Sequence, residues 1–170
     1  VYQMEQTNAL DIEDSFQLNK NITLKEVQGQ IANEVISSRK KYNEWFINLQ
    51  TGVGKTVLGV YLSAKFHKKT MIICFMKDIL SQWKDTYIEK TTINPDRIME
   101  INSGKWLEDI YLNHIGDPDH DIYLISPALI TSYLNNHPWY QIGDIFNDLG
   151  IGLLIFDEGH RNMSAIVKVN

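Results

Sequence analysis

Two short stretches of the chain carry side chains whose types and spacing suit phosphate chemistry. The first is Asn48-Leu49-Gln50-Thr51-Gly52-Val53-Gly54-Lys55-Thr56. Its glycines let the backbone curl so that N–H groups surround an anion, and a helix N-terminus behind them adds about half a positive charge. Lys55 could reach the β- and γ-phosphates of ATP, and the Thr56 hydroxyl could bind Mg²⁺. We therefore predict a nucleotide-binding loop made of Gln50, Thr51, Gly52, Val53, Gly54, Lys55 and Thr56.

The second stretch is the apolar run Gly152-Leu153-Leu154-Ile155-Phe156, which ends in Asp157-Glu158. A carboxylate at the end of a buried strand near a phosphate loop can hold Mg²⁺, directly or through water. A second carboxylate beside it can orient or deprotonate the attacking water. We predict that Asp157 binds the metal together with Thr56 and that Glu158 acts on water. An acidic turn that caps the next helix is the alternative for this pair taken alone.

Alternating apolar runs and helical patterns predict the elements that position these two stretches. Strands are predicted at 45–49, 70–75, 97–101, 122–125 and 152–156, and helices at 23–41, 56–67, 78–89, 106–114, 128–135 and 140–149. Each strand is a nearly continuous apolar run, which is typical of a parallel sheet buried on both faces. Ligands bind at the carboxyl ends of the strands in such sheets, so the two stretches can meet at one site.

The start of the first helix and the N-terminal residues carry weaker signals. Thr23-Leu24-Lys25-Glu26 fits a capping box in which Thr23 and Glu26 satisfy free helix N–H groups. Residues 1–21 are mostly polar and are predicted to be an extension, with the folded domain at 22–170.

Composition limits the classes of protein that fit. The 170 residues are 44% hydrophobic and 22% charged, which suits one folded domain. The net charge of −5 means that a nucleic acid would have to bind a local patch. The single cysteine, Cys74, cannot form an internal disulfide and favours a reducing compartment. No apolar run reaches about 18 residues and the N-terminus is polar, so we expect an intracellular protein without a membrane partner.

The residues 50–56 together with Asp157-Glu158-Gly159-His160 resemble the first RecA-like domain of superfamily 2 DExH-box helicases and translocases. In that family the first glycine of the loop pattern is often absent, as it is at Leu49. The resemblance implies a three-layer α/β/α RecA-like P-loop NTPase fold with a mostly parallel sheet. It also implies that His160 links the nucleotide site to nucleic acid and to a second RecA-like domain. A polar residue at a helix start is the alternative for His160.

Three further segments extend the resemblance. Leu24-Lys25-Glu26-Val27-Gln28 is similar to the upstream L-x-x-x-Q element, which implies that Gln28 recognises adenine. The alternatives are a solvated helix residue at this position and Gln30 in the adenine role. The segment 76–83 is similar to motif Ia, which implies nucleic-acid contacts by Lys77, Ser81 and Gln82, whereas Trp83 falls on the apolar face and is predicted to be core. Ser126-Pro127 resembles the next strand-contacting element, and the alternative is that Ser126 caps its helix.

The leading interpretation is an ATP-dependent motor domain that moves on DNA, duplex DNA being favoured over RNA. An RNA helicase and a non-motor P-loop regulatory subunit are the alternatives. Within the superfamily, Asp157-Glu158-Gly159-His160 resembles the Swi/Snf-type remodellers and the NTPases of large cytoplasmic DNA viruses. Type I or III restriction translocases are the alternative. The chain stops ten residues after His160 without a second RecA-like domain and its arginine finger. We therefore expect these residues alone to bind ATP weakly and to hydrolyse it hardly at all.

Overall fold

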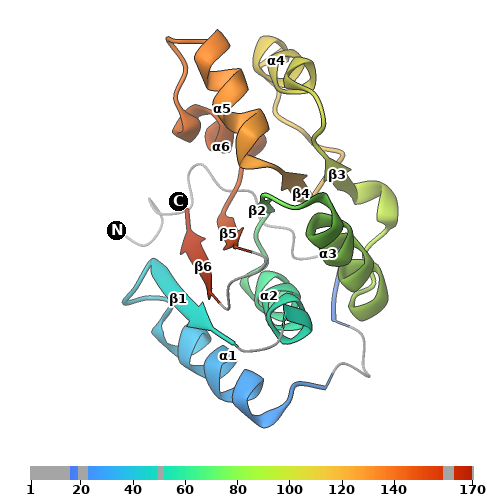
Figure 1. The fold of residues 1–170 in the computed structure, drawn as a ribbon, viewed down its shortest axis with the longest axis vertical. Helices are drawn as coiled ribbons and strands as arrows, with labels where there is room; N and C mark the ends of the chain where they lie inside the picture. The colour runs from blue at the N-terminus through green and yellow to red at the C-terminus, as the bar shows by residue number, and fades with distance from the viewer. Residues whose placement is uncertain (1–15, 19–22, 50–51, 159–162, 170) are drawn as a thin grey trace.

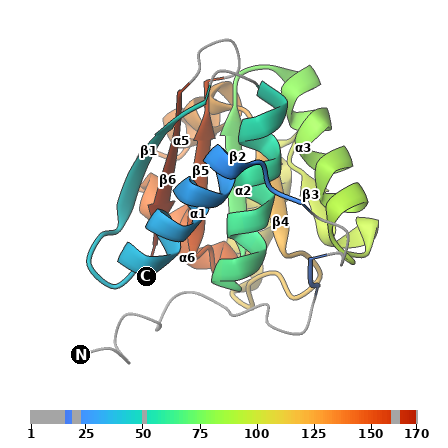
Figure 2. The same ribbon diagram turned by 90° about the horizontal axis from the view of Figure 1, so that it is seen from below.

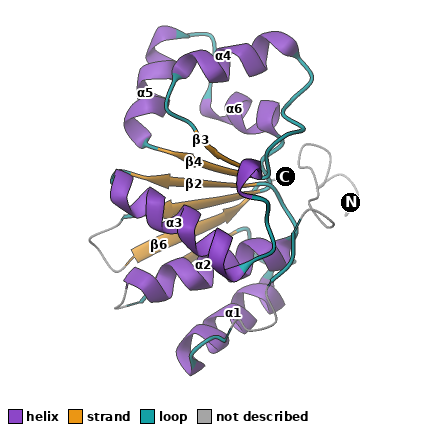
Figure 3. Cartoon of the chain, turned by 90° about the vertical axis from the view of Figure 1, so that its right-hand side faces the viewer, coloured by secondary structure: helices purple, strands orange, loops and turns teal. Residues whose placement is uncertain are grey.

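A six-stranded sheet runs through the middle of the molecule, with helices on both of its faces (Figures 1 and 3). The computed structural model describes residues 16–18, 23–49, 52–158 and 163–169. The strands lie in the order β1-β6-β5-β2-β4-β3. Their bounds are β1 Glu44–Asn48, β2 Thr70–Cys74, β3 Ile98–Glu100, β4 Ile122–Ile125, β5 Leu153–Asp157 and β6 Met163–Lys168.

Among the described residues, three α-helices cover each face of the sheet. Figure 2 shows the first three in front of the sheet, and Figure 3 shows the two helical layers on opposite sides of it. One layer holds α1 Glu26–Ser38, α2 Gly52–Phe66 and α3 Lys77–Lys90, and the other holds α4 Gly104–Asn113, α5 Pro127–Asn136 and α6 Ile142–Leu149. A 3-10 turn, η2 (Pro95–Arg97), leads into β3. None of the helices in the described part of the chain has the length and apolar character that crossing a membrane requires.

The two helical layers bury separate sets of side chains because neighbouring residues of a strand point to opposite faces. In β2, Ile72 joins the core under α2 and α3, whereas Met71 and Ile73 join the core under α4 to α6. Trp83 anchors the first core and is 1% exposed. The predicted α/β fold with a mostly parallel sheet is confirmed: β2 is parallel to β4 and β5, and β3 is parallel to β4.

One strand was not predicted. β6 follows β5 after residues 158–162 and runs antiparallel to both of its neighbours, β5 and β1. A connection this short permits only antiparallel pairing, because a parallel partner needs a long crossover. Two antiparallel steps in succession leave β1 pointing the same way as β5. The carboxyl ends of β1 and β5 therefore lie at the same edge of the sheet.

Two local predictions were wrong. The first strand is not buried along its length: β1 is an edge strand in which Ile47 is 5% exposed and its neighbour Phe46 is 69% exposed. The capping box is not formed by Thr23 and Glu26, since Lys25 is the N-cap of α1. The Lys25 N–H donates instead to Oε1 of Gln28, at 2.8 Å.

Part of the predicted N-terminal extension packs on the domain. Phe16 is 3% exposed, and its ring forms a T-shaped pair with that of Tyr87 at a centroid distance of 6.2 Å. Leu18 forms an antiparallel bridge with Thr91. The boundary at residue 21 between extension and domain stays a prediction.

Candidate nucleotide site

The two stretches singled out in the sequence meet at the carboxyl edge of the sheet. The loop after β1 leads into α2, which begins at Gly52, and β5 ends at Asp157. Asp157 pairs in register with Cys74 at the end of β2, so the carboxyl ends of β5 and β2 lie side by side. The edge is the place where ligands of open α/β sheets bind.

Lys55 and Asp157 form a buried ion pair at this edge. Nζ of Lys55 lies 3.5 Å from Oδ1 of Asp157, and each side chain is 3% exposed. Burying two charges is unfavourable unless they are paired, and the attraction between them is strong away from water. The fold therefore brings together a lysine and a carboxylate that are 102 residues apart in sequence.

A second helix reaches the same carboxylate. The indole Nε1–H of Trp83 in α3 donates to Oδ2 of Asp157 at 2.8 Å. The prediction that Trp83 belongs to the core is confirmed, because the residue is 1% exposed. Its polar contact was missed. The N–H group of a tryptophan that sits in a core normally finds an acceptor, and this general preference was the available signal.

Gln28 connects α1 to the first turn of α2. Its Nε2 donates to the carbonyl oxygen of Gly54 at 3.0 Å, and its Oε1 accepts from Lys25 N–H. The residue is 6% exposed, so the alternative of a solvated helix residue is wrong, whereas Gln30 is exposed. Contact between Gln28 and adenine stays a prediction.

The structure describes some of the remaining predicted site residues and leaves others out. Thr56 is buried, at 3% exposure, and Glu158 is exposed at the end of β5. Gly52 and Val53 open the backbone of α2. Gln50, Thr51 and His160 lie outside the described residues, so their roles stay predictions.

The donor set fits ATP with Mg²⁺. Magnesium prefers oxygen ligands and is usually held by one or two carboxylates together with substrate phosphates. Asp157 supplies the carboxylate and Thr56 a hydroxyl, while Lys55 supplies a cation for phosphate. No group of three or more His, Cys, Asp or Glu side chains in the described ranges could hold a metal by itself. These residues therefore favour a magnesium ion whose remaining ligands would be oxygens of a bound phosphate.

Cys74 lies beside the site without the properties of a nucleophile. The thiol is buried at the end of β2, and burial raises its pKa above the ordinary value. The Asp157 carboxylate nearby raises this pKa further. A thiol is nucleophilic as the thiolate, so Cys74 fits a packing role.

The predicted nucleic-acid contacts lie on the outside of the same edge. Lys77, Ser81 and Gln82 are exposed on α3, opposite its buried face. Ser126 caps α5, because its hydroxyl accepts from Leu129 N–H at 3.3 Å. This is the alternative that the sequence left open for Ser126. Contact between these four residues and a nucleic acid stays a prediction.

An open hollow of about 660 Å³ lies between the end of β2 and α5. Its lining combines an aromatic ring with small polar side chains: Phe75, Pro127, Ala128, Thr131, Ser132, Asn135 and Asn136. The Phe75 side chain is 74% exposed. The sequence interpretation missed Phe75, although an aromatic residue directly after a buried parallel strand was a visible signal, because ligands bind at that end.

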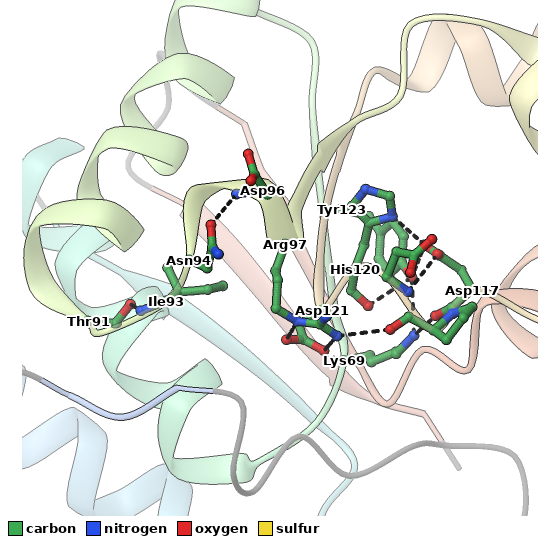
Figure 4. A network of polar contacts seen from close by, with 12 residues as sticks. Lys69, Thr91, Ile93, Asn94, Asp96, Arg97, Asp117, His120, Asp121 and Tyr123 are labelled. Carbon is green, nitrogen blue, oxygen red and sulfur yellow. Dashed lines mark hydrogen bonds and ion pairs between the residues drawn. The ribbon is translucent and has the colours of Figure 1, made fainter.

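A separate polar cluster closes the opposite edge of the sheet (Figure 4). The buried carboxylate of Asp117 accepts from the Tyr123 hydroxyl at 2.8 Å and contacts His120 Nδ1 at 2.8 Å. Lys69 donates to the Asp117 carbonyl, and burial lowers the pKa of its ammonium group. Arg97 and Asp121 form a two-bonded ion pair beside them. These contacts tie the loop before β4 to the amino ends of β2 and β4, away from the candidate site.

Comparison with known proteins identifies a family. Residues 21–169 match the model of the family described as "Type III restriction enzyme, res subunit". The match covers nearly the whole chain, including both stretches of the site.

Individual relatives are more distant. One is the "General transcription and DNA repair factor IIH helicase/translocase subunit XPB" of Enterocytozoon bieneusi, which is 27% identical over 119 residues. The alignment covers 67% of this chain and 19% of that protein. The "TFIIH basal transcription factor complex helicase/translocase XPB subunit" of Trypanosoma brucei brucei is 29% identical, with coverage of 96% and 17%. The chain thus spans less than a fifth of these relatives.

Proposed function

We propose a function from one premise: the chain belongs to the family of the type III restriction enzyme res subunit, within superfamily 2 helicases. The chain is the ATP-binding part of a motor that couples ATP hydrolysis to movement on duplex DNA. Among the subfamilies that the sequence left open, the restriction-type translocases are the ones that this family match supports.

The observation that carries the proposal is the buried pair of Lys55 and Asp157, 3.5 Å apart at the carboxyl edge of the sheet. A lysine behind a glycine-rich loop and an aspartate at the end of a neighbouring strand are the charges that hold Mg·ATP. A purely structural ion pair would not explain the run Gly52-Val53-Gly54-Lys55-Thr56 at the start of α2. The relatives named as helicase/translocase subunits support the same interpretation.

Each residue has a distinct role in this proposal. Lys55 and the backbone of residues 50–54 bind the phosphates, and Gln28 contacts adenine. Thr56 and Asp157 hold Mg²⁺, which when bound neutralises charge on the phosphate oxygens. Glu158 is exposed at the strand end, where it can orient water. His160 links the site to nucleic acid and to a second domain.

The nucleic-acid side of the proposal rests on the outer surface of α3 and the neighbouring hollow. Lys77 supplies a positive charge for a phosphate, and Ser81 and Gln82 supply hydrogen-bonding groups on the exposed face of α3. Phe75 adds an exposed apolar ring beside this face. Contacts of these groups to phosphate would fit a site that follows the backbone without reading sequence.

A second RecA-like domain completes the site in this proposal. An arginine supplied across the cleft between two such domains raises the rate by orders of magnitude. We therefore expect the 170 residues alone to bind ATP weakly and to turn it over barely. An intracellular location is part of the same proposal.

The test is ATP turnover by the complete protein that carries this chain, without nucleic acid, with duplex DNA and with RNA. We expect Mg²⁺-dependent turnover that duplex DNA stimulates. Glu158→Gln should lower turnover by about 100-fold or more and leave ATP affinity nearly unchanged, because a positioned base contributes mainly to the chemical step.

The other outcomes separate the alternatives. Stimulation by RNA and not by duplex DNA would favour an RNA helicase. ATP binding that no nucleic acid affects would favour a regulatory P-loop subunit. Turnover in Glu158→Gln equal to that of the wild type would contradict the role of this residue.

A further inference from the structure

Trp83 lies between the helix that follows the phosphate loop and the helix that carries the proposed nucleic-acid contacts. The residue belongs to α3, and its indole ring packs against Gly59 of α2. A Cβ atom at Gly59 would lie 2.3 Å from Cη2 of the ring. Only a glycine in α2 leaves room for the indole at this depth, so the ring is held tightly in place.

The indole reaches past α2 to the metal-binding carboxylate. Its N–H donates to Oδ2 of Asp157 at 2.8 Å, while Oδ1 of the same carboxylate faces Lys55 at 3.5 Å. A hydrogen bond to an ionised oxygen at this distance is of the strong, charge-assisted kind. The χ2 angle of an aspartate has broad, nearly two-fold preferences, so a carboxylate needs partners of this kind to keep one orientation.

Trp83 also shares its helix with the exposed side chains that we assign to nucleic acid. Lys77, Ser81 and Gln82 occupy the outer face of α3, and Trp83 the inner face. One rigid helix therefore touches Asp157 on one side and presents the proposed nucleic-acid surface on the other. The sequence interpretation treated Trp83 only as a core residue.

We propose that Trp83 is a positioning residue for the magnesium site: its indole N–H holds the Asp157 carboxylate in the orientation that presents Oδ1 toward Lys55 and the metal. The link makes Mg²⁺ binding depend on the position of α3. The inference rests on the proposed function, since it assumes that Mg·ATP binds at Asp157. Partners that orient a metal ligand typically change metal affinity by about 10- to 100-fold when they are removed.

The test measures how much Mg²⁺ is needed for a non-hydrolysable ATP analogue to bind the complete protein. Trp83→Phe removes the N–H donor and part of the ring. A second variant carries 3-benzothienylalanine at position 83, which keeps the size and shape of the indole and replaces N–H with sulfur. Tyr87→Phe, on the same buried face of α3, leaves the Trp83–Asp157 hydrogen bond in place and serves as the matched control.

We expect both changes at position 83 to raise the Mg²⁺ concentration for half-saturation by about 10-fold or more. Binding of the analogue without Mg²⁺ should change much less, and Tyr87→Phe should behave as the wild type. A folded benzothienylalanine variant with wild-type Mg²⁺ dependence would overturn the proposal, even if its melting temperature fell. If the wild-type protein itself binds the analogue without any effect of Mg²⁺, the proposed function fails as well, and this result is distinct from the first.

Discussion

Carboxylates in this protein are stabilised to different degrees by their neighbours. Asp157 receives an indole N–H and lies beside a lysine cation. Asp148 in α6 accepts a hydrogen bond from the Tyr140 hydroxyl, and the electrostatic effect of His114 lowers its pKa. Burial raises the pKa of Asp148 above 3.8, and His114 offsets only part of this effect. The ionised form of Asp148 is therefore less favourable in the folded state than in the unfolded chain.

Replacing this carboxylate by an amide should stabilise the protein at neutral pH. Because its pKa is raised in the folded state, the Asp148 carboxyl makes its full contribution to stability below pH 3.8. This contribution is lost as the pH rises through the folded-state pKa. Asp148→Asn keeps an acceptor for Tyr140 without the charge. Because Asp148 is partly exposed, we expect a gain of no more than about 0.5 kcal/mol at pH 7.

Urea denaturation at neutral and acidic pH measures this gain. The difference between Asp148→Asn and the wild type should shrink as the pH falls toward 3.8. Asp85→Asn, at an exposed position on α3, is the control and should show no comparable difference. A gain for Asp148→Asn that is the same at both pH values would speak against the assigned cause.

At the scale of elements, the contact between α2 and α3 is the tightest constraint that the glycines reveal. The Trp83 ring occupies the space where a side chain at Gly59 would lie. Gly29 in α1 is the opposite case, because a Cβ there would meet nothing within 4 Å. Close packing therefore requires a glycine at position 59, whereas at position 29 only helix propensity distinguishes glycine from alanine.

Alanine at these two positions should shift stability in opposite directions. Gly59→Ala forces the ring or the helix to move and should lower the free energy of unfolding by about 1–3 kcal/mol. Gly29→Ala should raise it by about 0.4–1 kcal/mol, since alanine is the better helix former and restricts the unfolded chain. Urea denaturation of both variants is the measurement. A Gly59→Ala protein as stable as the wild type would show that α2 and α3 are not packed as described.

The elements differ in how far the sequence could predict them. β2 and β4 were predicted within a residue because both are parallel strands, mostly apolar, and buried along their whole length. β6 was missed because it mixes polar and apolar residues and follows a short connection, and only its pairing with β1 and β5 stabilises it as a strand. β1 was taken as buried, since the sequence cannot show that a strand lies at the edge of the sheet.

The site could be predicted only in part for a similar reason. The loop and Asp157 carry local signals that reflect the chemistry of phosphate, so residues of each type could be named. The contacts of Trp83 with Asp157 and of Gln28 with Gly54 depend on how α3 and α1 pack. Such contacts join residues that are far apart in sequence, and no short sequence motif predicts them.

On the scale of the whole molecule, the sheet topology assembles the site. β1 and β5 are not neighbours, because β6 lies between them, yet both end at the same edge. The start of α2 and the carboxylate at the end of β5 therefore meet, with Lys55 of α2 and Trp83 of α3 both in contact with Asp157. The polar cluster around Asp117 closes the other edge and leaves the carboxyl edge for ligands (Figure 4).

Equilibrium binding of ATP to the complete protein, with and without Mg²⁺, shows whether Lys55 binds the nucleotide when wild type and Lys55→Ala are compared. Loss of a charged hydrogen-bonding partner of phosphate should weaken Mg·ATP binding by about 10-fold or more. Lys65→Ala, at the exposed end of the same helix, should bind as the wild type does. Equal affinity of Lys55→Ala and wild type for Mg·ATP would contradict the assignment of this edge of the sheet as the nucleotide site.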